Sequence, residues 1–342
     1  MFPSGNQQPE NQPSGFSDRK RSAGLGTQHS MGVRKPLPSA STIAGCVASI
    51  TESGSYYLDR QVLGAVGKHG IIIAASHVTL DLNGYDVCGV PGSSTGIVVL
   101  AETGVVIRGG SVHGWGAHGI DAERCAAALV ECIRTSDNIG DGLRIGPGGS
   151  ADAVRASENG GNGLTLSAGS TLHDCAAVAC GGIGIDASEN CRVIDSAASA
   201  GARDGIRVGS GGVVRACLTR HNLGAGIVAS RLCTVSECDS VHNDSDGICV
   251  NDECCVLRSR SHGSRNGAGV RAIGQGNRID ENTCAENRIG IVAQAPGNII
   301  TRNAISASAE SAMDIACGNR AGRLLANPEY VKSEITWSNF VM

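Results

Sequence analysis

Charged residues recur at a fixed position of this chain and are the first candidates for chemistry. From residue 96 onward a four-residue phrase repeats: glycine, an aliphatic residue, a variable residue and a small apolar residue. The variable positions are Asp121, Arg144, Thr165, Asp186, Arg207, Val228, Cys249, Arg271, Val292 and Asp314. Opposite charges therefore meet at neighbouring repeats, as in Asp121–Arg144 and Asp186–Arg207. The simplest interpretation is ion pairing on a solvated sheet face, worth under about 1 kcal/mol for each pair.

Five residues in the middle of the chain form the candidate catalytic group: Asp186, Asp204, Arg207, His221 and His242. A lyase or epimerase needs a base for the proton next to a uronate carboxylate and a cation for the resulting charge. Histidine or arginine could act as the base, and Arg207 could pair with the carboxylate. His221 and His242 are one repeat apart and should stack roughly 5 Å from each other.

A glycoside hydrolase would instead need two carboxylates, about 5–5.5 Å or 6.5–9.5 Å apart. Asp204 and Asp246 are two repeats apart, or roughly 9.6 Å along a stack of strands. The structural alternative is that Asp141, Asp204 and Asp246 each precede a glycine as ordinary Asp-Gly turn residues. A second candidate patch comprises His113, Trp115, His118 and Asp121.

The fifteen cysteines show no metal-binding pattern. The sequence contains no Cys-x-x-Cys pair and no Cys/His set at zinc-finger spacing, so it predicts neither a metal nor a cofactor. Free cysteine behaves as a small buried hydrophobe. Two sets share a repeat position and are expected to be interior stacks: Cys175, Cys217 and Cys238, and Cys191, Cys233 and Cys254.

The elements that must position these residues follow from the spacing of the phrase. Its successive intervals are 23, 23, 21, 21, 21, 21, 21, 22, 21 and 22 residues. A second apolar phrase follows each first one by about eight residues, so each repeat holds two or three short strands and no helix. Asn138, Asn159, Asn222, Asn243, Asn266 and Asn287 precede the phrases, where asparagine suits a tight turn because it tolerates a left-handed backbone.

Other repeat folds of this period do not fit the residue types. The repeats are too poor in leucine for leucine-rich repeats and lack the Gly-Gly-x-Gly-x-Asp series of calcium-binding rolls. They also do not keep the six-residue period of left-handed hexapeptide helices. The sequence therefore predicts an all-β, single-stranded right-handed parallel β-helix of about 11 coils with terminal caps. Residues 1–40 are expected to be a disordered tail, 41–95 the N-terminal cap and first coils, 96–315 the repeats and 316–342 the C-terminal cap.

Composition narrows the partners and the compartment. The 342 residues carry a formal charge of −4, which does not favour nucleic acid or a polybasic membrane contact. The apolar runs are too short for a membrane span. The N-terminus lacks a basic leader with an apolar core, which predicts a cytoplasmic location, with non-classical export as the alternative. Met31 is an alternative start.

Three segments carry a resemblance to a known family: Gly54–Leu58, the run Val78–Tyr85 and the ending Ile335–Phe340. Together with the 110–116 segment they resemble bacterial right-handed parallel β-helix repeat proteins of the pectate-lyase-like superfamily, over roughly residues 41–342. The resemblance implies the fold and, by analogy, a sugar polymer as ligand. Motifs of the superfamily's polygalacturonases, alginate epimerases and pectate lyases do not occur.

The expected function is a scaffold that binds a carbohydrate polymer or has a structural role, for example as a rod in an extracellular or spore-like assembly. The alternative is a polysaccharide lyase, epimerase or glycoside hydrolase that works on the outer sheet face. A polysaccharide is the expected partner, and the sequence leaves the oligomeric state open.

Overall fold

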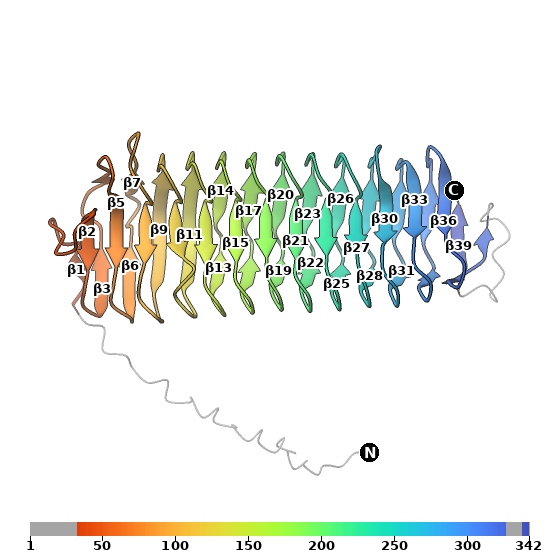
Figure 1. Ribbon diagram of the computed structural model, residues 1–342, viewed down its shortest axis with the longest axis horizontal. Coiled ribbons are helices and arrows are strands. Elements are labelled where there is room, and N and C mark those ends of the chain that lie inside the picture. Colours follow the sequence, from red (N-terminus) through yellow and green to blue (C-terminus); the bar gives the residue numbers. More distant parts are fainter. Residues whose placement is uncertain (1–32, 326–336, 342) are drawn as a thin grey trace, which may run out of the picture. The chain divides into compact units, whose positions relative to one another are not determined.

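The computed structural model describes residues 33–325 and 337–341. The described residues form strands that belong to two parallel sheets, one of 26 strands and one of 13. Figure 1 shows the strands following one another in chain order along one axis. No helix in the described part is long and apolar enough to cross a membrane.

Each coil contributes one strand to the 13-stranded sheet. These strands are β2 (Cys46–Ile50), β5 (His69–Ile73), β8 (Ile97–Val99), β10 (Ile120–Ala122), β12 (Leu143–Ile145), β15 (Leu164–Leu166), β18 (Ile185–Ala187), β21 (Ile206–Val208), β24 (Ile227–Ala229), β27 (Ile248–Val250), β30 (Ala268–Ala272), β33 (Ile289–Ala293) and β36 (Ser311–Ile315).

The 26-stranded sheet consists of two rows of strands joined at a bend. The first row contains β1 (Lys35–Pro36), β3 (Gly54–Tyr57), β6 (Val78–Asp81), β13 (Ser150–Asp152), β16 (Thr171–His173), β19 (Arg192–Ile194), β22 (Val213–Arg215), β25 (Thr234–Ser236), β28 (Cys255–Leu257), β31 (Arg278–Asp280), β34 (Ile299–Thr301) and β37 (Arg320–Ala321). The second row contains β4 (Val62–Leu63), β7 (Asp86–Cys88), β14 (Arg155–Ser157), β17 (Ala176–Val178), β20 (Ala197–Ser199), β23 (Leu218–Arg220), β26 (Asp239–Val241), β29 (Arg260–His262), β32 (Thr283–Ala285), β35 (Ala304–Ser306), β38 (Leu324–Leu325) and β39 (Asn339–Val341). The long strands β9 (Val106–His113) and β11 (Leu129–Ser136) run through both rows.

The observed register confirms the parallel β-helix, with equivalent repeat positions paired in neighbouring coils. Ile185 pairs with Ile206, and Ile206 pairs with Ile227. The first and last residues of each central strand point inward, as with Ile206 and Val208, which are fully buried, while Arg207 between them faces outward. This alternation follows from the two-residue period of a strand.

The number of coils differs slightly from the prediction. The 13-stranded sheet contains the eleven predicted strands and two earlier ones, β2 and β5. The step from β5 to β8 breaks the 21–23-residue period, because Ile71 pairs with Ile97, 26 positions further along, whereas the step from β2 to β5 is 23 residues. A longer turn hides the repeat from a search for equal spacing.

The recurring glycine has a packing reason. A Cβ atom at Gly205 would lie 2.7 Å from the carbonyl oxygen of Gly226, and one at Gly226 would lie 2.6 Å from that of Gly247. Each glycine therefore lets the backbone of the next coil approach closely. Only glycine fits without moving the backbone.

Each coil bends at three corners, and a residue in the left-handed region often occupies them. In one coil these residues are Leu232, Glu237 and His242, with φ of 58°, 58° and 52°. At the last corner the left-handed residue is the one before the asparagine, as His242 precedes Asn243. The expectation that asparagine itself adopts this conformation was therefore wrong at these corners.

The corner asparagines instead form buried ladders. Asn282 donates from Nδ2 to Oδ1 of Asn303, and Asn303 donates in the same way to Asn339, each at 3.0 Å. Asn222 and Asn243 pair likewise at 2.9 Å. The first ladder lies between the two rows and the second lies between the second row and the 13-stranded sheet. Their asparagines also satisfy backbone groups of the preceding coil, since Asn303 Oδ1 accepts from the Asn282 backbone N–H. Asn266, by contrast, is exposed.

The two predicted cysteine stacks are confirmed as interior. Cys175, Cys217, Cys238, Cys191, Cys233 and Cys254 are all buried. All fifteen cysteines lie within the described residues, and all are free thiols.

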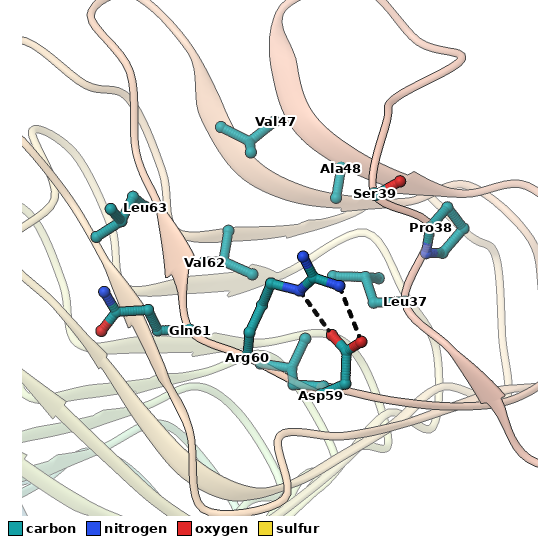
Figure 2. A pocket seen from close by; sticks show the side chains of 11 residues that line it. Leu37, Pro38, Ser39, Val47, Ala48, Asp59, Arg60, Gln61, Val62 and Leu63 are labelled. Atoms are coloured by element: carbon teal, nitrogen blue, oxygen red, sulfur yellow. Dashed lines mark hydrogen bonds and ion pairs between the residues drawn. The ribbon is translucent and has the colours of Figure 1, made fainter.

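The N-terminal end of the described chain has an apolar hollow of about 460 Å³. Figure 2 shows Leu37, Val47 and Val62 around it and the Asp59–Arg60 ion pair at its rim. The ion pair is exposed, and the hydrogen bond from Arg60 lowers the pKa of Asp59. None of the predicted site residues lines this hollow.

The predicted tail, 1–40, lies mostly outside the described residues. Within its last part, β1 pairs with β3. The proposed C-terminal cap, 316–342, is described only in part. Phe340 in β39 pairs with Ala304, and Trp337 is exposed with the guanidinium of Arg302 over its ring.

Candidate functional site

The candidate site is the outward row of the 13-stranded sheet. The central residues of successive strands pair in register in the order Asp121, Arg144, Thr165, Asp186, Arg207, Val228, Cys249, Arg271, Val292 and Asp314. We call these ten residues the outer ladder. The predicted alignment of charged side chains on one face is confirmed.

Arg144 contacts three carboxylates at one end of the outer ladder. Its guanidinium lies 3.4 Å from Asp121 and 3.7 Å from Asp141, and it also contacts Glu123. The predicted Asp121–Arg144 pair therefore forms as part of a larger network. These side chains are partly exposed, so the network contributes little to stability.

Arg207 has a different partner from the predicted one. Its Nη2 donates to Asp204 Oδ2 at 2.8 Å, and no direct hydrogen bond or ion pair joins it to Asp186 in the described part of the chain. The other oxygen of Asp204 accepts from the backbone N–H of Ala225 at 2.9 Å. Asp204 thus uses one oxygen to hold the next turn and the other to orient Arg207.

Asp141 and Asp246 also accept hydrogen bonds both from a turn of the backbone and from a side chain of the outer ladder. Asp141 accepts from the Asn162 backbone N–H at 2.8 Å and from the Thr165 hydroxyl at 3.1 Å. Asp246 accepts from the Ala268 N–H at 2.7 Å, while Arg271 pairs with both of its oxygens. One oxygen of each aspartate accepts a backbone N–H of a turn, as the turn interpretation predicts. The other oxygen accepts from a side chain of the outer ladder.

Asp186 accepts fewer hydrogen bonds than Asp204 or Asp246. Among the described residues, its carboxylate accepts one side-chain hydrogen bond, from Asn162 Nδ2 at 3.5 Å. Burial raises the pKa of the Asp186 carboxyl above its ordinary value; Arg207 opposes this shift, and the carboxylates of Asp141 and Asp204 add to it. The carboxyl is therefore easier to protonate than a solvated aspartate.

The Asp246–Arg271 pair was not among the predicted catalytic residues. It is the most enclosed pair of the ladder, with side chains 10% and 20% exposed. Beside it, burial and then the Asp246 carboxylate raise the pKa of the Cys249 thiol to about 12. Arg271 occupies a predicted outward position, but only the fold brings it to the Asp246 turn of the preceding coil.

The structure separates the two histidines from the aspartates and Arg207. His221 and His242 stack with their ring centroids 5.6 Å apart, as expected from the repeat. Both are left-handed corner residues, with φ of 55° and 52°. Within the described residues, no hydrogen bond or ion pair connects them to Asp186, Asp204 or Arg207.

A third histidine, His262, continues the stack at 5.1 Å from His242 in an edge-on arrangement. The sequence pattern does not mark His262, because Gly263, and not His262, takes the repeat position of His242. A Cβ at Gly263 would lie 2.2 Å from His242 Nδ1, so the glycine leaves room for the ring. An open hollow of about 530 Å³ lies beside His221 and His242.

The second predicted patch is also divided. Trp115 is buried, and its indole N–H donates to the Val87 carbonyl at 2.9 Å. His118 accepts from the Asp141 backbone N–H at 3.0 Å. His113 lies on the second row of the other sheet, beside Cys88, while Asp121 belongs to the outer ladder. Trp115 lies in the loop after β9 and its side chain is part of the core.

Comparison with known families identifies the class of protein that this geometry defines. The profile described as "Right handed beta helix region" matches residues 69–239, and the chain belongs to this family. A second profile, described as "Periplasmic copper-binding protein (NosD)", matches residues 161–327. No curated protein sequence matches the chain.

Solved structures of related shape include three proteins of different kinds. The Dettilon tailspike protein has a TM-score of 0.50 and 12% identity, covering 84% of this chain and 61% of the tailspike. The A-module of a mannuronan C-5 epimerase from Azotobacter vinelandii has a TM-score of 0.47 and 13% identity, covering 85% and 90%. A surface adhesin of Streptococcus pneumoniae has a TM-score of 0.38 and 11% identity, covering 76% and 82%. This chain spans about three fifths of the tailspike, and the likeness establishes the fold.

Copper, named in the second family description, does not fit the described residues of the matched segment. A copper site needs imidazole, thiolate or thioether ligands that converge. Among the described His, Cys, Asp and Glu side chains, one cluster brings three ligand atoms together; it lies outside that segment, at Asp86, Cys88 and His113, and offers one thiol, one imidazole and one carboxylate.

Proposed function

We propose that the protein is a scaffold that binds a carbohydrate polymer along the outer ladder. The observation that carries this proposal is the in-register row of donors and acceptors on one sheet face, from Asp121 to Arg271. The polar rungs are interrupted at Val228, and arginine recurs at Arg144, Arg207 and Arg271, so a ligand with repeating hydroxyl or carboxylate groups can bond to the same chemistry at several rungs. Its affinity then grows with the number of rungs engaged.

The charges of the ladder favour binding over acid–base catalysis. Asp204 and Asp246 are hydrogen-bonded through both oxygens and are held by arginines. Such carboxylates orient the guanidinium groups, which remain partly exposed and can donate to a ligand. Arginine suits this role because its fork of donors is planar and rigid.

The resemblance to the pectate-lyase-like superfamily supports carbohydrate as the ligand class by analogy alone. The proposed compartment is the periplasm, as the NosD family description states for its own members; the cytoplasm is the alternative. Fractionation of cells that produce the full chain distinguishes the two.

The test is a binding panel of acidic and neutral polysaccharides, with and without calcium, measured by calorimetry on the full chain. The double variant Asp186→Asn/Arg207→Gln is expected to bind the best polymer at least tenfold more weakly. Arg192→Gln, an exposed arginine on the other sheet, is the matched control and should bind like the wild type. Equal binding by the double variant, or no binding of any polymer by the wild type, contradicts the proposal.

A second candidate function rests on the asymmetry between Asp186 and Asp204. Burial favours the protonated form of Asp186, whereas Asp204 accepts a charge-assisted hydrogen bond from Arg207. A carboxyl that protonates readily, together with a second carboxylate, is the pair that a glycoside hydrolase requires. Mass spectrometry of the incubated polymers separates the outcomes: fragments with one added water indicate a hydrolase, unsaturated fragments a lyase, and intact polymer the scaffold.

A further inference from the structure

Three metal-ligating side chains meet on the second strand row, away from the outer ladder. Asp86 and Cys88 lie on β7, and His113 lies at the end of β9. One ligand atom from each residue lies within 4.8 Å of the other two. The closest pair is Cys88 Sγ and His113 Nε2, at 3.2 Å.

The β-helix itself creates this cluster. Asp86 and Cys88 are two positions apart on one strand, so they face the same side of the sheet. Cys88 and His113 are paired in register, so their side chains are neighbours on adjacent coils. All three side chains are half-buried. The 25-residue separation between cysteine and histidine matches no local motif, which is why the sequence alone predicted no metal.

The surroundings hold two of the ligands in place. Ser111 donates from Oγ to Asp86 Oδ1 at 2.6 Å, which orients the carboxylate. The Val87 carbonyl, between the two ligands of β7, accepts the Trp115 indole N–H. Supporting contacts of this kind keep ligands oriented in known metal sites.

The geometry points to a zinc site, and we propose that Asp86, Cys88 and His113 bind one Zn²⁺ or a similar borderline divalent metal. Thiolate, imidazole and carboxylate are the ordinary zinc ligands. Bonds of about 2.3 Å to sulfur and 2.0–2.1 Å to nitrogen place those two atoms roughly 3.6 Å apart around a tetrahedral ion. Cys88 and His113 need to separate by only a few tenths of an ångström to reach that spacing.

Three protein ligands leave one coordination position for water. The residues paired with the ends of this cluster, Leu63 and Ser136, are not metal ligands of the usual kind. A metal ion binds the Cys88 thiolate, so binding displaces the thiol proton. The site should therefore release a proton on binding and weaken as the pH falls. This inference is independent of the proposed function.

The test uses the full chain, stripped of metal, and Co²⁺ as a coloured probe that Zn²⁺ displaces. The wild type should bind one equivalent with a thiolate-to-cobalt charge-transfer band, which Zn²⁺ removes and Ca²⁺ does not. Cys88→Ser and His113→Ala should each lower the affinity at least tenfold, since each removes one of three ligands. Cys132→Ser removes an exposed thiol elsewhere and is the matched control. Wild-type affinity in Cys88→Ser and His113→Ala overturns the proposal.

X-ray absorption of the zinc-loaded wild type tests the site without relying on a folded variant. The expected shell has one sulfur at about 2.3 Å and nitrogen or oxygen neighbours at about 2.0–2.2 Å. A shell without sulfur, or with two or more sulfurs, assigns the metal to other residues and overturns the proposal.

Discussion

Two aspartates show how the surroundings of a residue decide its chemistry. Burial raises the pKa of Asp186, which has one long hydrogen bond. Asp280 is more enclosed, with its side chain only 2% exposed, and burial alone would raise its pKa as well. Hydrogen bonds from Arg302, Arg278 and Thr301 outweigh burial and hold the pKa of Asp280 well below its usual range. The two sites differ in their partners more than in their depth.

Asp280→Asn is expected to destabilise the fold by about 2 kcal/mol at pH 7, because it leaves Arg302 and Arg278 without their carboxylate. The figure is modest because both arginines are partly exposed. A lowered folded-state pKa adds stability above the unfolded value of about 3.9, and this stability disappears as the pH falls towards the folded value. The difference between wild type and variant should therefore shrink below about pH 4, as measured by urea unfolding across pH.

Asp239→Asn is the control for this prediction, since its ion pair with Arg260 is about half exposed on both sides. It should change the free energy of unfolding by less than about 1 kcal/mol. A pH-independent loss in Asp280→Asn would show that packing, not charge, accounts for its effect.

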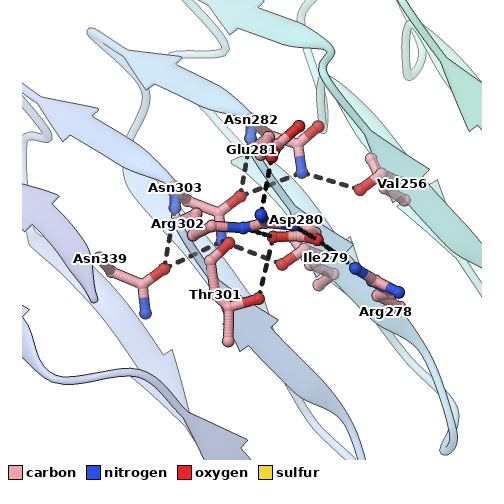
Figure 3. Close-up of polar contacts among 10 residues, drawn as sticks. All are labelled: Val256, Arg278, Ile279, Asp280, Glu281, Asn282, Thr301, Arg302, Asn303 and Asn339. Carbon is pink, nitrogen blue, oxygen red and sulfur yellow. Dashed lines mark hydrogen bonds and ion pairs between the residues drawn. The ribbon is translucent and has the colours of Figure 1, made fainter. Parts of the chain in front are cut away.

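At the scale of the element, the corner between the two rows of the 26-stranded sheet determines how one coil sits on the next. Its buried asparagine donates to the coil before and after, and a left-handed residue precedes it. Figure 3 shows Asn282, Asn303 and Asn339 aligned across three coils, next to the Asp280 network. At the next corner, between the second row and the 13-stranded sheet, a glycine such as Gly290 allows the close backbone approach.

Asn303→Ala should cost about 3 kcal/mol or more, because it leaves the Asn282 backbone N–H and several amide groups buried without partners. Asn266→Ala, at an exposed turn, should stay within about 0.5 kcal/mol of the wild type. Chemical unfolding of the two variants measures both values. A loss of less than about 1 kcal/mol in Asn303→Ala would mean that water replaces the ladder.

At the scale of the whole molecule, the coils form a one-dimensional stack in which each contacts chiefly its neighbours. Removing one complete coil should therefore preserve the fold. Deletion of residues 206–226 joins Gly205 to Ile227 and keeps every inward position in register, since Ile206 and Ile227 are paired equivalents. The variant should remain monodisperse with an unchanged far-UV circular dichroism shape and a urea m-value about a tenth lower or less.

Deletion of residues 206–215 removes about half a coil and is the control. It shifts later strands out of register and turns inward side chains outward, so this variant should aggregate or fail to fold. If both deletions behave alike, the coils are not the independent structural unit.

Much of the fold could be predicted because the repeat is visible in the amino-acid sequence. The glycine phrase and its spacing identified eleven strands of the 13-stranded sheet and the outward row. The glycine phrase did not mark β2 and β5, which lie in the region predicted as N-terminal cap and first coils, and the step from β5 to β8 is longer than the period. The corner asparagines also differ from expectation, because the residue before each of them adopts the left-handed conformation.

For the candidate site, the sequence predicted only that the residues of the outer ladder align on one face. Asp186 and Arg207 occupy the expected adjacent positions, but Arg207 pairs with Asp204, and His221 and His242 are corner residues outside this group. The sequence by itself determined the parallel β-helix, because identical periodic patterns bury their apolar faces only by stacking. The tertiary structure alone decided which turn aspartate meets which arginine and that Asp86, Cys88 and His113 converge. Those contacts depend on the exact coil length and on side-chain direction, which fix distances between residues one coil apart.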